Sequence, residues 1–144
     1  MKKLTYLSLI IAFTISSCQQ KNGEDNVESE SAEQAEWKEM DEFHMIMAES
    51  FHPYRDSANV APAKDYASEM ASLADTWMQA KLPGKVSNDE VKSALEKLSQ
   101  QCEDFKLMVD SGTDEEIGQA LTAIHDTFHG LQESWYRNKN SAHQ

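Results

Sequence analysis

Several features are scarce or missing in this 144-residue sequence, and each absence excludes a class of protein. Only 5 residues are Gly and 3 are Pro, which excludes a collagen-like chain and favours helix. Two Cys are too few for a disulfide-stapled miniprotein. Lys and Arg number 13 against 25 Asp and Glu, and the net charge of −12 excludes a basic nucleic-acid-binding domain. The sequence has no hydrolase, kinase or nucleotide-binding motif, so we expect no enzyme.

The first 17 residues have the plan of a secretory signal peptide. Lys2 and Lys3 precede an apolar run over residues 4–15, which is too short to cross a bilayer. The run ends in Ile15-Ser16-Ser17-Cys18, which resembles the bacterial lipobox. This resemblance implies that residues 1–17 are removed and that Cys18 becomes the lipidated first residue. The mature chain then loses two Lys and no acidic residue, and becomes more negative.

Residues 18–31 are predicted to form a flexible tether between the lipid and a folded domain. The segment is polar and acidic, and its one large apolar residue is Val27, so it cannot bury enough surface to fold. The lipid would make the membrane the first partner and place the protein outside the cytoplasm. Whether the anchored protein faces the periplasm or lies on the cell surface stays open.

Residues 32–137 are predicted to form an up-down-up-down four-helix bundle, followed by a polar tail over residues 138–144. Four segments repeat apolar residues at spacings of three and four, as helices with one buried stripe do. The first is expected to end before Pro53, the second to run from Pro62 to Pro83-Gly84, and the connection over residues 53–61 to be long. The four stripes are Trp37, Met40, His44, Met47 and Phe51; Tyr66, Met70, Leu73, Trp77 and Ala80; Val91, Leu95, Leu98, Cys102, Phe105 and Val109; Ile117, Leu121, Ile124, Phe128, Leu131 and Trp135.

Helix-capping residues flank the third and fourth stripes. The segments Ser87–Glu90 and Thr113–Glu116 both have the capping-box pattern. Gly112 is predicted to end the third helix in a left-handed conformation. His52, just before Pro53, is expected to cap the end of the first helix, and a second, weaker metal site there is the alternative.

The candidate ligands lie at matching heights in such a bundle. Folding the chain at its predicted turns places His44 at the level of His125, and Met40 at the level of His129. His125 and His129 are four residues apart on one helical face. The set of candidate metal ligands is His44, His125 and His129, with the soft side chains Met40, Met70 and Cys102.

Imidazole, thiolate and thioether groups favour a transition-metal ion, and copper, zinc, nickel and cobalt all remain candidates. Because Cys18 carries the lipid, Cys102 is left as one unpaired thiol in an oxidising compartment. The alternative is that these His, Met and Cys side chains are ordinary core or boundary residues. The predicted function is metal sequestration, sensing or delivery.

The fourth segment, with His125-Asp126-Thr127-Phe128-His129 and then Trp135-Tyr136-Arg137, resembles the C-terminal helix of cytochrome c-prime. Soluble b-type four-helix cytochromes are similar, and the resemblance implies His129 and Met40 as axial ligands of a non-covalent haem b. His125 and Phe128 stand where the two haem-attaching Cys should be, which excludes covalent haem.

The arrangement also resembles helical periplasmic sensors of nickel and cobalt, which collect His ligands from their first and last helices. A third alternative is a non-catalytic interaction or chaperone module whose acidic surface meets a basic protein. A homodimer remains open, and no nucleic-acid partner is expected.

Overall fold

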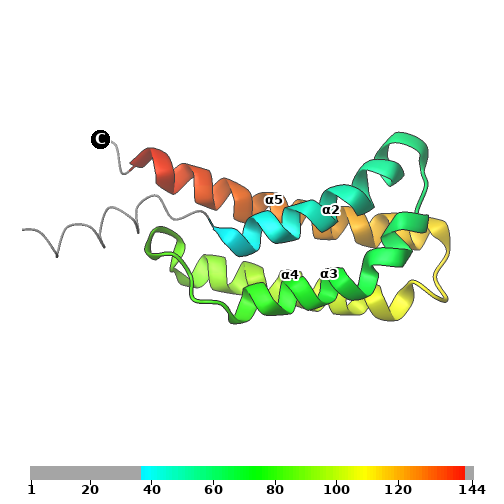
Figure 1. Ribbon diagram of the computed structural model, residues 1–144, viewed down its shortest axis with the longest axis horizontal. Helices are drawn as coiled ribbons and strands as arrows, with labels where there is room; N and C mark the ends of the chain where they lie inside the picture. Colours follow the sequence, from blue (N-terminus) through cyan, green and yellow to red (C-terminus); the bar gives the residue numbers. More distant parts are fainter. Residues whose placement is uncertain (1–36, 142–144) are drawn as a thin grey trace, which may run out of the picture. The chain divides into compact units, whose positions relative to one another are not determined.

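The computed structural model describes residues 37–141, which form four long helices and one short 3-10 helix, with no strand among them. The helices are α2 (Lys38–Ser57), α3 (Ala61–Gln79), α4 (Asp89–Met108) and α5 (Asp114–Ser141), and the 3-10 helix is η1 (Gly84–Val86). Each helix packs against the next in the chain, and α5 returns to α2 (Figure 1). The predicted up-down-up-down bundle is confirmed. The predicted signal peptide, lipidated Cys18 and tether lie outside the described residues.

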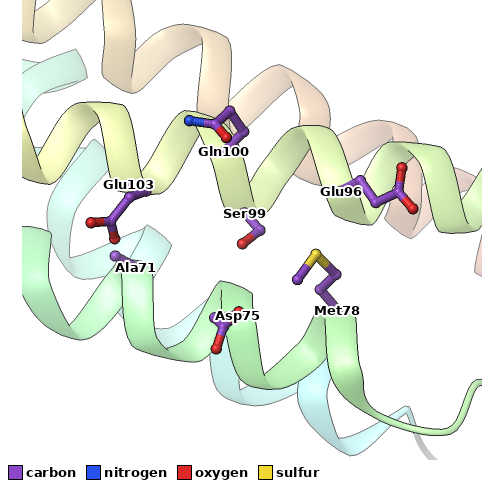
Figure 2. Close-up of a pocket in the computed structure, with 7 residues that line it drawn as sticks. All are labelled: Ala71, Asp75, Met78, Glu96, Ser99, Gln100 and Glu103. Carbon is purple, nitrogen blue, oxygen red and sulfur yellow. The ribbon is translucent and has the colours of Figure 1, made fainter.

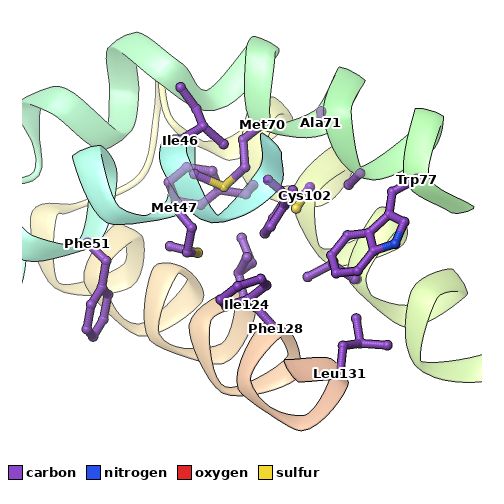
Figure 3. Close-up of a cluster of buried hydrophobic side chains, with 14 of the residues drawn as sticks. Ile46, Met47, Phe51, Met70, Ala71, Trp77, Cys102, Ile124, Phe128 and Leu131 are labelled. Carbon is purple, nitrogen blue, oxygen red and sulfur yellow. The ribbon is translucent and has the colours of Figure 1, made fainter. Parts of the chain in front are cut away.

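The predicted apolar stripes form the core. Trp37, Trp77 and Trp135 meet at one end of the bundle, with ring centroids 5.0 Å apart for Trp37–Trp77 and 5.5 Å apart for Trp37–Trp135. Phe43 and Phe128 continue this aromatic cluster, 5.7 Å apart (Figure 3 shows Phe128 and Trp77). Offset and edge-on rings of this kind contribute about 0.5–1.5 kcal/mol per pair beyond their buried area. The cluster therefore joins α2, α3 and α5 through side chains distant in sequence.

The first helix is longer than predicted, because α2 runs through Pro53 and ends at Ser57. A Pro ring fixes φ near its helical value and removes only one backbone hydrogen bond, so the surrounding contacts outweigh its cost here. The C-cap residue is Ala58, whose φ of 53° is left-handed and whose N–H donates to the Tyr54 carbonyl at 2.7 Å. The connection to α3 is therefore short, and the predicted long connection over residues 53–61 is wrong.

One of the two predicted capping boxes is formed. The backbone N–H of Thr113 donates to Glu116 Oε2 at 2.8 Å, and the Glu116 N–H donates back to Thr113 Oγ1 at 3.3 Å. At α4 the cap is Asn88 instead of Ser87, because the Asn88 side chain accepts from the Val91 N–H at 2.9 Å. Gly112 is not left-handed, which corrects another prediction; its N–H continues the turn by donating to the Met108 carbonyl at 2.8 Å.

The last helix also exceeds its predicted length, since α5 reaches Ser141 and includes part of the predicted tail. Among residues 37–141, no helix has both the length and the apolar character needed to cross a membrane.

Gly118 of α5 provides the space into which α2 places Tyr54. A Cβ at position 118 would collide with two ring carbons of Tyr54 and with its hydroxyl oxygen. Gly130 of the same helix is exposed and has nothing near the corresponding position. The two glycines therefore differ in what surrounds them, and only Gly118 is required by packing.

We predict that Gly118→Ala destabilises the protein by about 1–3 kcal/mol, because the methyl group displaces the Tyr54 ring. Gly130→Ala is the matched control and should stabilise it by about 0.5–1 kcal/mol through helix propensity. Urea unfolding followed by circular dichroism measures both. Equal stabilisation by the two substitutions would contradict the close packing at Gly118.

Candidate imidazole site between the first and last helices

The structure separates the predicted ligands into a buried set and a surface set. Met40 is 3% exposed, and Met70 and Cys102 are completely buried in the apolar core, where Figure 3 shows the latter two. His44 and His129 are exposed, and the His125 side chain is 24% exposed. The three sulfur groups are therefore sealed in the interior, while the imidazoles lie at the surface.

His125 and His129 form a close pair on α5. Their Nε2 atoms are 3.0 Å apart, and their rings meet edge-on with centroids 4.3 Å apart. Residues four apart on a helix are neighbours on one face, so the regular backbone alone brings these rings together. At this separation one ring donates a hydrogen bond to the lone pair of the other.

Helix α2 contacts the His125 end of this pair directly and the His129 end through Phe128 of α5. The Phe51 ring stacks on His125 with centroids 3.7 Å apart and an angle of 13°. His44 stacks on Phe128 at 5.4 Å, and Phe128 lies 5.8 Å from His129. His125 is thus level with Phe51, and His44 is nearer the level of His129. The sequence predicted His44 at the level of His125. Because α2 continues through Pro53 and the chain turns later, each residue of α5 lies level with a later residue of α2 than predicted.

His52 is the residue whose role the sequence interpretation missed. It does not cap α2, since the helix continues past it to Ser57. The pKa of His125 on the neighbouring helix is lowered chiefly by burial, and His52 makes the smallest of the contributions to that shift. His44 and His52 are eight residues apart on α2, a spacing of about two helical turns that places both on one face.

The pKa of His125 is lowered below its ordinary value of 6.5, first by burial and then by the nearby His129 and His52. Asp126 opposes the shift, with its Oδ1 3.7 Å from His125 Nδ1. The neutral imidazole is therefore favoured at neutral pH, and neutral imidazole is the form that binds metal ions.

Burial has the opposite effect on the pKa of Cys102. Burial raises its pKa to about 12, so the thiol stays protonated. Within residues 37–141 no group of three or more His, Cys, Asp or Glu side chains is assembled as a metal-binding cluster. The arrangement that the structure does provide is the two-imidazole pair, flanked by His44 and His52 across the seam.

A haem between Met40 and His129 does not fit these residues. The interior beside Met40 is filled by rings that contact one another: Phe43 lies 5.7 Å from both Trp77 and Phe128, and Trp77 lies 6.3 Å from Phe128. The proposed axial groups also differ in setting, because Met40 is buried and His129 is exposed. A porphyrin there would have to displace the aromatic cluster.

Comparison with known proteins adds no relative, since no family model, curated protein or solved structure matches this chain. The resemblances to lipoproteins, cytochromes and metal sensors therefore stay predictions from the residues alone.

We predict that Cys102 resists alkylation while the protein is folded. With a pKa of about 12, about one thiol in ten thousand is ionised at pH 8, and the folded core also blocks access. Peptide mass spectrometry after iodoacetamide treatment should find Cys102 unmodified in buffer and fully modified in 8 M urea. Modification in buffer at the rate of a free cysteine would show that the core opens there.

We also predict that the fold loses stability as the pH falls below 6.5. A lowered pKa means that the unfolded chain binds a proton more readily at His125 than the folded chain does. The contribution of His125 is therefore complete above pH 6.5 and is lost as the pH falls through its folded pKa. Urea unfolding at pH 7.5 and 5.5 measures this loss. His125→Phe keeps an aromatic ring against Phe51 but cannot titrate, so its loss of stability should be smaller; an equal loss would contradict the assignment.

Proposed function

We propose that this protein binds a transition-metal ion through His125 and His129, for sequestration, sensing or delivery. The observation that carries the proposal is the 3.0 Å separation of the two Nε2 atoms. Two nitrogen ligands at about 2.0–2.1 Å from one metal ion, at neighbouring coordination positions, lie about 2.9–3.4 Å apart. The pair therefore already has the spacing of two neighbouring ligands. To bind an ion, the ring that donates the hydrogen bond would carry its proton on Nδ1 instead of Nε2, and both rings would turn so that their Nε2 lone pairs point at an ion beside the Nε2–Nε2 line.

The surroundings favour His125 as the better-ordered ligand of the two. Stacking on Phe51 restricts its ring, and its lowered pKa keeps its lone pair available. His44 and His52 lie on the facing helix, and rotation of either side chain is the route to a third ligand. A neutral third imidazole would complete a nitrogen-rich site.

The ligand chemistry points to copper, nickel, cobalt or zinc in the divalent state. Imidazole binds all four, and the general affinity order places copper first. Because Cys102 is protonated and buried, we assign no thiolate to the site. Two protein ligands leave several coordination positions to water or to another molecule, which suits an ion that is taken up and passed on.

The location that we propose for this activity rests on the sequence before residue 37. The signal-like segment and the lipobox-like end at Cys18 would hold the bundle on the extracytoplasmic side of a membrane. An anchored metal-binding domain there would meet ions as they enter the cell envelope.

Calorimetric titration of the full chain with copper, nickel, cobalt and zinc salts tests the proposal. We expect about one ion per chain, and an affinity at least about tenfold weaker in His125→Ala/His129→Ala, because both chelating nitrogens are gone. His44→Ala and His52→Ala, each made singly, identify the third ligand by a smaller loss.

Cys102→Ala is the control, and it should bind the metal as the parent does. Helix content measured by circular dichroism should be unchanged in the surface variants, since His129 is exposed and the core is intact. Unchanged affinity in the double variant would overturn the proposal.

A further inference from the structure

A groove runs along the outer side of the α3–α4 pair, on helices that do not carry the imidazole site. Its first part is an open hollow of about 430 Å³, shown in Figure 2. A second hollow of about 340 Å³ continues from it, and the two share Met78 and Glu96 in their walls. Lys81 and Lys92 line only the second hollow. The groove thus follows the seam between two antiparallel helices.

The groove exists because small side chains face each other across this seam. Ala71 of α3 and Ser99 of α4 line the first hollow, between larger neighbours such as Met78. Ala71 and Asp75 of α3 and Ser99 and Glu103 of α4 line a hole on the outside of the bundle, where none of the described helices fills it.

The negative charge of the groove lies at the rim of the first hollow, because the second hollow has Lys81 and Lys92 beside Glu96. Asp75, Glu96 and Glu103 line the first hollow, together with the neutral Gln100, and no basic residue is among its lining residues. Lys106 pairs with Glu103 at 2.8 Å and the Gln79 amide donates to Asp75 at 2.7 Å. Glu96 has no hydrogen bond or ion pair with any residue of the described part. The rim therefore has an excess of negative charge.

We propose that this groove binds a cationic amphipathic helix of another protein. One apolar side chain of that helix would enter the hole over Ala71 and Ser99. Lys or Arg residues three or four positions away would reach Asp75, Glu96 and Glu103. Charge complementarity disfavours a second copy of this chain, because two negative rims would face each other in a protein of net charge −12.

The test uses the full chain and a fluorescein-labelled synthetic helix with Leu on one face and Lys on the other. Fluorescence anisotropy should show binding that weakens at least tenfold between about 50 and 300 mM salt, because exposed charges are screened. Asp75→Asn/Glu96→Gln should weaken binding at least tenfold. Ser99→Phe, which fills the hole without changing charge, should do the same, and Ser99→Leu is a smaller replacement with the same purpose.

The matched control is Asp41→Asn/Glu133→Gln, which removes two exposed carboxylates from α2 and α5. It should change the affinity by less than twofold. An equal loss of affinity in the groove and control variants would mean diffuse charge attraction and would overturn the proposal. Two other results would also overturn it: no binding of the helix by the parent chain, or undiminished binding by Ser99→Phe. Sedimentation of the chain alone tests whether a second copy occupies the groove instead. A dimer that Ser99→Phe dissociates would assign the groove to a second copy and overturn the proposal.

Discussion

The bundle depends on closure between its first and last helices, α2 and α5. These two helices are farthest apart in sequence, so their contact costs the most chain entropy. They are joined by ring contacts spaced along their length: Trp37–Trp135 at one end, Phe43–Phe128 in the middle and Phe51–His125 toward the other end. The shape of the core follows from this seam, and so does the position of His44 and His52 relative to the His125–His129 pair.

The architecture was predictable because local and global signals agree. Apolar residues at spacings of three and four identify the buried face of each helix, and Thr113 with Glu116 identifies where α5 begins. The errors occur where a local rule competes with packing. Pro53 normally ends a helix, but tertiary contacts of the following turn, such as Tyr54 on Gly118, carry α2 past it. A single sequence gives no measure of those contacts.

The site was predictable only where one helix determines it. The spacing of four residues is enough to bring His125 and His129 together, whatever the rest of the fold does. Contacts across the seam depend on the register of α2, which shifted with Pro53, so the role of His52 was missed and the level of His44 was misplaced. The role of Cys102 was also not predictable from the sequence. A periodic apolar pattern cannot distinguish a buried metal ligand from a buried thiol whose raised pKa keeps it protonated.

The contact between Tyr54 and Gly118 helps to fix the register of α2 along α5. The Tyr54 ring occupies a notch that exists because position 118 has no side chain, so sliding or rotation of α2 along α5 would take the ring out of this notch. His52 stands two residues before Tyr54 on the same turn region, and His125 stands two turns after Gly118 on the other helix. Tyr54 thus helps to set the register in which the imidazoles of α2 face those of α5. Substitutions at this notch would shift that register while leaving all four histidines of α2 and α5 in place.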